Sequence, residues 1–129
     1  MKRIINRIDE LFSEMVALRR DIHKHPELGF QETRTAALIE NYLQKLGIKT
    51  NRLAKTGVVG IIKGRKESPV LMLRADMDAL PITEETDVSY KSVNDGIMHA
   101  CGHDAHTAML LTAAKILSEN RDQLDGTIK

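Results

Sequence analysis

The sequence predicts an α/β domain in which helices pack against a sheet. Apolar residues recur with the helical period in three segments, 4–22, 31–46 and 103–117. Two short runs between the second and third of these segments, 57–62 and 69–73, are β-branched or continuously apolar and are typical of strands. Helices and strands in this order favour an α/β sandwich over a helical bundle.

The length of 129 residues allows one domain with one core. A net charge of +1 without a basic stripe argues against a nucleic-acid partner. No apolar run approaches the roughly 20 residues that cross a bilayer, so no membrane partner is expected. Asp9 and Glu10 interrupt any apolar stretch of the kind found in signal peptides. A single cysteine, Cys101, excludes an internal disulfide and favours a reducing, cytoplasmic location.

The first two predicted elements are amphipathic helices. The apolar stripe of the first consists of Ile4, Ile8, Leu11, Met15, Leu18 and Ile22, widened by Phe12 and Val16. Because Pro26 cannot sit inside a helix, this helix should end near Lys24. The second helix presents Ile39, Tyr42, Leu43 and Leu46 on one face. Gly47 can supply the left-handed position that closes it.

The middle of the chain predicts strands and a loop. The run 57–62 is β-branched and bounded by glycine, whereas 69–73 is continuously apolar, the pattern of a strand covered on both faces. Residues 81–97 show no period and predict a loop. After the third helix, residues 127–129 have the character of an opening strand. Because a finished domain rarely stops there, we expect a truncated domain.

The segment 99–106 concentrates residues that bind metals, namely His99, Cys101, His103 and His106. Thiolate and imidazole are the donors that zinc prefers, and cobalt or manganese can share such sites. Because Gly102 has no Cβ, Cys101 and His103 can point the same way from a tight loop before the third helix. A lone cysteine or histidine is more often part of the packing. The cluster favours a metal site, although catalytic sites normally use three or more protein ligands.

Two acidic residues precede this cluster in the sequence and a third lies within it. Asp76 and Asp78 follow the apolar run 69–73, and the carboxyl ends of strands carry ligand sites in open α/β sheets. On a continuing strand both would point to the same side and need compensation from a cation, a histidine or a hydrogen bond. Orienting a metal ligand is one use of such a carboxylate, and a solvated polar loop is the alternative. Asp104 lies in the first turn of the third helix, where free N–H groups favour a carboxylate.

His23 and His25 lie at the predicted end of the first helix, among lysine and arginine. They could bind a metal. Capping of the helix C-terminus explains them equally well, and we favour this structural interpretation.

Three stretches together resemble a known family, the dinuclear metallo-amidohydrolases that include aminoacylases, hippurate hydrolases and indole-acetyl-amino-acid hydrolases. The stretches are 20–28, 74–81 and 98–107, which occur in the family's order. The resemblance implies a partial three-layer α/β/α sandwich of the zinc-aminopeptidase-like catalytic domain. Residues 1–129 would form a single, incomplete part of it, with the dimerisation domain absent.

The resemblance also implies roles for individual residues. Cys101 and His103 would be metal ligands, with Cys101 at the place where relatives use a bridging carboxylate. Asp78 would be a supporting carboxylate. Carboxypeptidase-type relatives have a histidine at the place of Asp76, and aspartate there is the pattern of the aminoacylase-like branch.

The implied activity is hydrolysis of N-acyl amino acids by water activated on two divalent cations (Zn, Mn, Co or Ni) in an enzyme that is a homodimer when complete. The family's general-base glutamate and further ligands follow residue 129, so the chain alone is expected to be inactive.

Two other functions fit the residues. Cys101 could be a nucleophile activated by His103 or His106, and a chelator would leave such an enzyme active. The chain could instead be a small, non-catalytic metal-binding module, which should bind metal tightly and unfold when the metal is removed.

Overall fold

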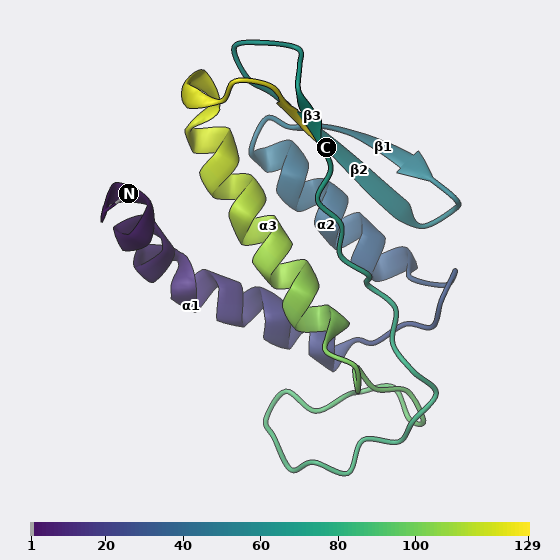
Figure 1. The fold of residues 1–129 in the computed structure, drawn as a ribbon. Coiled ribbons are helices and arrows are strands. Elements are labelled where there is room, and N and C mark those ends of the chain that lie inside the picture. Colours follow the sequence, from purple (N-terminus) through teal and green to yellow (C-terminus); the bar gives the residue numbers. More distant parts are fainter. Residues whose placement is uncertain (1) are drawn as a thin grey trace.

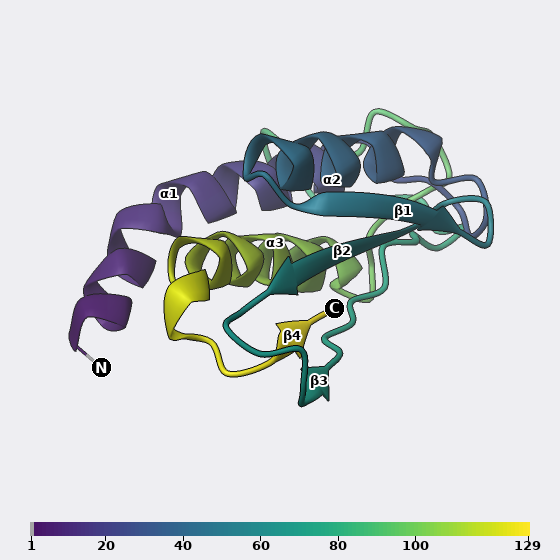
Figure 2. The ribbon, with the colours of Figure 1, turned by 90° about the horizontal axis from the view of Figure 1, so that it is seen from above.

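The computed structural model describes residues 2–129, which form one mixed sheet with helices packed against it (Figures 1 and 2). The elements in chain order are α1 (Lys2–Lys24), α2 (Thr33–Lys45), β1 (Lys49–Leu53), β2 (Gly57–Lys63), β3 (Val70–Leu71), α3 (His103–Glu119), a short 3-10 helix (Arg121–Gln123) and β4 (Thr127–Ile128). The α/β class is confirmed, and so are the three predicted helices. Strand β1 was not predicted, because most of its side chains are exposed and it carries no apolar pattern.

The sheet has the strand order β1-β2-β4-β3. Strand β2 is antiparallel to both of its neighbours, β1 and β4, whereas β3 and β4 are parallel. The last strand of the chain therefore enters the sheet between β2 and β3, as Figure 2 shows.

The core lies between the sheet and two helices. Leu43 of α2 and Leu111 of α3 join Ile48 and Ile62 in one buried cluster, so both helices cover the same face of the sheet. A Cβ at Gly60 would lie 3.1 Å from side-chain atoms of both Leu43 and Ile48, which explains a glycine at the centre of β2. Helix α1 packs along α3 (Figure 1).

Helix α1 ends at Lys24 as predicted, and Gly47 has the left-handed φ of 69° predicted for the end of α2. The predicted burial of the α1 stripe is wrong in part. Leu11 and Ile22 are buried, but Ile4 and Phe12 are 47% and 58% exposed, and Ile8 is exposed as well. Arg7 already reaches Glu119, the last residue of α3, so the turns before it extend beyond the helix that α1 packs against.

The run 69–73 is paired as a strand only at Val70 and Leu71. Its predicted burial on both faces is wrong, because Val70 and Met72 are 55% and 70% exposed. Strand β3 is an edge strand, paired on one side by β4. Residues 81–97 form the predicted loop, closed at its base by the bridge between Leu80 and Met98.

Within residues 2–129, no helix combines the length and the hydropathy needed to cross a membrane.

Candidate metal centre

Gly102 sets the geometry at the start of α3. Its φ of 94° lies in the left-handed region, as predicted for a bend that a Cβ would oppose. The chain turns there from Cys101, which is exposed with a free thiol, to His103, the first residue of the helix. The bend therefore places a thiol and an imidazole on either side of one glycine.

His103 is held by the segment that follows β3. Its Nδ1 lies 3.0 Å from the backbone oxygen of Asp78 and 3.0 Å from the carboxylate Oδ1 of the same residue. Both partners are acceptors, so Nδ1 carries the proton and donates. This arrangement leaves Nε2 as the nitrogen with a lone pair for a cation. A carboxylate or carbonyl behind the ring is the usual way in which proteins orient a histidine ligand.

The segment that contains Asp78 is positioned by the loop after α1. Ala79 donates its N–H to the backbone oxygen of Glu27 at 2.8 Å, and Leu28 forms a bridge with Ala79. A Cβ built on Gly29 would lie 4.0 Å from Oδ2 of Asp78. The loop after α1 thus borders the carboxylate that holds His103.

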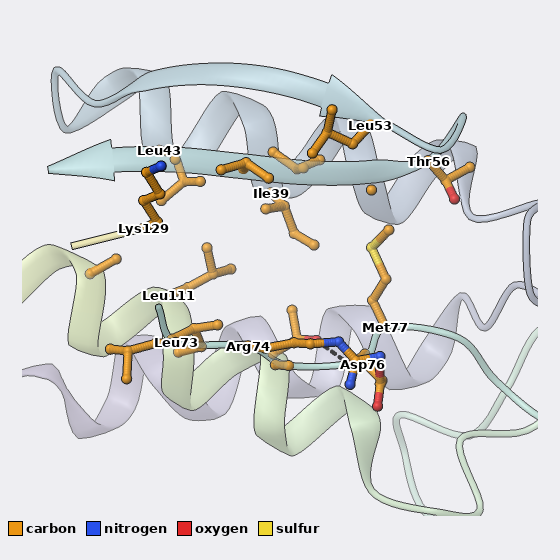
Figure 3. Close-up of a pocket in the computed structure, with 18 of the residues that line it drawn as sticks. Ile39, Leu43, Leu53, Thr56, Leu73, Arg74, Asp76, Met77, Leu111 and Lys129 are labelled. Carbon is orange, nitrogen blue, oxygen red and sulfur yellow. Dashed lines mark hydrogen bonds and ion pairs between the residues drawn. The ribbon is translucent and has the colours of Figure 1, made fainter. Parts of the chain in front are cut away.

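Asp76 has different partners from Asp78. Its carboxylate forms an ion pair with Arg74, which Figure 3 shows, and its backbone oxygen accepts a hydrogen bond from the hydroxyl of Thr107 at 3.0 Å. The two carboxylates therefore receive separate compensation, one from an arginine and the other from a histidine. Only Asp78 reaches His103.

His23 is buried and has a carboxylate at each ring nitrogen. Nδ1 lies 2.7 Å from Oδ2 of Asp104, and Nε2 lies 3.1 Å from Oε1 of Glu84. Oδ2 of Asp104 also forms an ion pair with Nε of Arg19, at 2.7 Å. The expected capping of the helix end by His23 is wrong, because its ring nitrogens contact carboxylates of α3 and of the 81–97 loop. These contacts leave neither nitrogen available to a metal. This cluster of Arg19, His23, Glu84 and Asp104, which we call the buried ionic cluster, ties α1, α3 and the 81–97 loop together.

Asp104 lies in the first turn of α3, as predicted. Its carboxylate pairs with Arg19 and His23, however, and not with the N–H groups of that turn. The carboxylate is completely buried against α1 and takes the charged partners there, because hydrogen bonds between ions are stronger than those to neutral amides.

The other three histidines, His25, His99 and His106, lie in different environments. Nδ1 of His25 bonds the backbone oxygen of Asp21 at 2.9 Å, which confirms the helix-capping interpretation. His99 is buried, and neither ring nitrogen has a partner among the described residues. Burial lowers the pKa of His99. His106 is exposed, with its ring 6.3 Å from that of His103.

Sequence reasoning missed Glu84 entirely. It lies in a loop without periodicity, yet its side chain is buried and accepts hydrogen bonds from the Thr86 hydroxyl, the Ser92 N–H at 2.6 Å and His23. Nothing in the local sequence distinguishes it from the adjacent, exposed Glu85.

The side chains on either side of Gly102 suit a divalent cation in kind. Cys101 offers a thiol, and His103 offers an imidazole whose Nδ1 is already bonded, the donor pair typical of zinc-type sites. In the part of the chain that the structure describes, no three His, Cys, Asp or Glu side chains gather closely enough to hold a metal. Residues 2–129 therefore contain two candidate ligands, Cys101 and His103, and the carboxylate behind one of them.

Comparison with known proteins relates the chain to a family of hydrolases. Residues 72–129 match peptidase family M20/M25/M40. The chain is 48% identical to an N-acyl-L-amino acid amidohydrolase of Geobacillus stearothermophilus over 95% of its length, and 50% identical to the IAA-amino acid hydrolase ILR1-like 5 of Arabidopsis thaliana over 93%.

A solved structure has the same fold. The Bacillus subtilis YXEP protein, described as a dinuclear metal binding peptidase from the M20 family, superposes with a TM-score of 0.89 at 44% identity. The match covers 93% of this chain and 34% of that one. The two relatives are covered to 33% and 28%, so the chain spans about a third of the length of the proteins that it matches. By sequence and by fold, the chain is similar over nearly its whole length to members of peptidase family M20/M25/M40.

Proposed function

We propose that the chain is the N-terminal part of the catalytic domain of a metal-dependent amidohydrolase that acts on N-acyl amino acids. Cys101 and His103 are its two ligands for divalent metal, and Asp78 holds His103. The observation that carries this proposal is the pair of 3.0 Å contacts between Nδ1 of His103 and Asp78, which leaves Nε2 as the donor beside an exposed cysteine.

The residues of this chain prepare the site. Asp78 fixes the tautomer and the direction of the His103 ring, and the bend at Gly102 separates His103 from Cys101 by a single residue. A thiolate adds negative charge to balance a divalent cation. When bound, divalent cations activate water and polarise the amide carbonyl. The names of the two relatives support N-acyl amino acids as substrates, with a carboxylic acid and an amino acid as products. The proposal includes a cytoplasmic, homodimeric complete enzyme.

Metal binding tests the ligand assignment. We expect the chain to bind Zn²⁺ or Co²⁺ weakly and to lose this binding in both Cys101→Ala and His103→Ala. Asp78→Asn should weaken binding by about 10–100-fold, because the ring of His103 loses the carboxylate that orients it. Equilibrium dialysis with elemental analysis measures both the affinity and the stoichiometry.

Asp76→Asn is the matched control, because it removes a carboxylate from the same segment that contacts Arg74 instead of His103. Its metal affinity should stay within about twofold of the unchanged chain, well below the loss caused by removing a carboxylate behind a ligand. Equal losses in the two aspartate variants, or unchanged binding in Cys101→Ala, would contradict the assignment.

A turnover assay tests whether the isolated chain is active. We expect no release of amino acid from N-acyl amino acids by pure 129-residue protein with Zn²⁺, Co²⁺ or Mn²⁺, because two ligands do not make a catalytic site. Chromatography of the free amino acid is the measurement. Turnover lost in Cys101→Ala would show that the chain is an enzyme by itself. If that turnover also survived a chelator, Cys101 would act as a nucleophile.

A further inference from the structure

His23 links two parts of the molecule that border the candidate metal centre. Its Nδ1 lies 2.7 Å from Oδ2 of Asp104, and its Nε2 lies 3.1 Å from Oε1 of Glu84. The side chain of His23 is 4% exposed, and those of the two carboxylates are at most 1% exposed. The proposed function gives this buried polar ring no role.

The contacts of His23 fix its charge. An ionised carboxylate only accepts hydrogen bonds, so the ring donates to Glu84 from Nε2 and to Asp104 from Nδ1. Nη2 of Arg19 lies 3.3 Å from the same Nδ1, but the contact with Asp104 is shorter and would be repulsive if Nδ1 carried a lone pair. A ring with a proton on each nitrogen is an imidazolium. Arg19 and His23 then balance the charges of the two carboxylates, which buried charges require.

One side of this link is attached to the segment that carries the candidate ligands. Asp104 follows His103 directly in the chain, within the first turn of α3. The position of the Asp104 side chain therefore constrains the backbone at His103. Because α1 provides both Arg19 and His23, it anchors this turn of α3.

The other side of the link is attached to the 81–97 loop, which Figure 1 shows next to the end of α1 and the beginning of α3. Glu84 lies in this loop and contacts His23. Further along the loop, Val93 donates its N–H to the backbone oxygen of Lys24 at 2.9 Å. The loop is therefore fixed to the last turn of α1 at two places.

The ends of this loop continue into the candidate metal centre. Leu80 and Met98 close the loop at its base, where each donates its N–H to the backbone oxygen of the other. Asp78 precedes this base on one side, and Cys101 follows it on the other. A loop that is fixed to α1 therefore helps to fix both segments, one with the carboxylate behind His103 and the other with the thiol.

We propose that His23 is a positioning residue of the metal centre. As a buried imidazolium it holds Asp104 and Glu84 in place, and through them it sets the geometry of the two proposed ligands. None of its hydrogen bonds goes to a proposed ligand, so it acts through the carboxylates. The identity of the ligands rests on the proposed function, whereas the charge of the ring and its hold on the loop can be measured without metal.

His23→Gln tests the link in the metal-free chain. Glutamine is uncharged and carries its donors on a single nitrogen, so it cannot donate to a carboxylate on either side as the ring does. NMR of isotope-labelled histidine rings in the unchanged chain should show a proton on each nitrogen of His23 at pH 7. In His23→Gln, the amide of Ser92, which donates to Glu84 at 2.6 Å, should exchange with solvent at least about tenfold faster.

Co²⁺ binding tests the positioning of the ligands, because the absorption of a cobalt–thiolate bond reports the geometry of the thiolate. We expect His23→Gln to lower the affinity for Co²⁺ by about tenfold, the lower end of the effect of removing a residue behind a ligand. The absorption at saturating Co²⁺ should also change in shape. A residue that only stabilises the fold would leave this spectrum unchanged, since the metal-bound chain is folded.

Two neighbours of His23 provide the controls. His25→Gln makes the same replacement at the same helix end, where His25 contacts Asp21 outside the buried ionic cluster. Ile22 is completely buried in the core, so Ile22→Val or Ile22→Ala lowers stability without touching the cluster. The variant whose urea midpoint is closer to that of His23→Gln is used. Both controls should keep the Co²⁺ spectrum and an affinity within about twofold of the unchanged chain.

Glu84→Gln guards against misfolding of His23→Gln, because it breaks the link from the loop side and leaves the contact with Asp104 intact. It should change the Co²⁺ spectrum in the same direction. An unchanged spectrum and affinity in both variants, or a neutral His23 ring, would overturn the proposal while the ligand assignment stands. Co²⁺ binding that persists in Cys101→Ala would overturn the ligand assignment, and the ring charge and the Ser92 exchange would then decide the link by themselves.

Discussion

Replacing Asp104 by alanine is expected to lower the free energy of unfolding by about 3–5 kcal/mol, the typical cost of breaking a buried ion pair by removing one partner. The Asp104 side chain is completely buried and contacts Arg19 and His23 at 2.7 Å each. Without the carboxylate, Arg19 and His23 lose their shared acceptor, and the buried His23 ring keeps the cost of its burial. Urea denaturation at pH 7, followed by circular dichroism without added metal, measures the change.

Asp21→Ala is the matched control, because Asp21 also pairs with an arginine, Arg34, at 2.9 Å, but on the surface. An exposed pair contributes only about 0–1 kcal/mol, so this variant should remain close to the unchanged chain. A destabilisation by Asp104→Ala no larger than that of Asp21→Ala would show that the buried ionic cluster does not hold α1 against α3.

Local features of the fold could be predicted from the sequence because a single residue type decides them. Pro26 ends α1 near Lys24, and Gly47 and Gly102 have the left-handed backbone that closes α2 and opens α3. Strand β1 could not be predicted in this way. Its exposed residues carry no apolar alternation, and only pairing with β2 makes them a strand.

The same contrast between local sequence and tertiary packing holds for the candidate site. The spacing around Gly102 predicts Cys101 and His103 as ligands, and this stays a prediction. Position after an apolar run pointed to Asp78, whose contact with His103 the structure shows. The buried ionic cluster could not be predicted from the sequence, because His23 is 81 positions away from Asp104 and 61 positions away from Glu84. Charged residues separated in this way give no periodic signal, and their burial depends on how α1 and α3 pack.

Acid is expected to weaken the fold through Glu84. Burial opposes ionisation of its side chain, but hydrogen bonds from Thr86, Ser92 and His23 outweigh burial and hold the pKa of Glu84 at about 2, against an ordinary 4.5. A carboxyl whose pKa is lower in the folded chain stabilises it fully above its unfolded pKa, and this contribution is lost as the pH falls through the folded value. The window therefore runs from about pH 4.5 down to about pH 2.

The size of this effect follows from the gap between the two pKa values, which at about 1.4 kcal/mol per pH unit corresponds to roughly 3 kcal/mol. The difference in unfolding free energy between the unchanged chain and Glu84→Gln should shrink by about this amount between pH 5 and pH 2, because the glutamine does not titrate. Denaturant titrations across this range measure it. The exposed neighbour supplies the control, since Glu85→Gln should leave the pH dependence of the chain nearly unchanged. If the difference in unfolding free energy between the unchanged chain and Glu84→Gln stayed constant with pH, Glu84 would not be held ionised by its three donors.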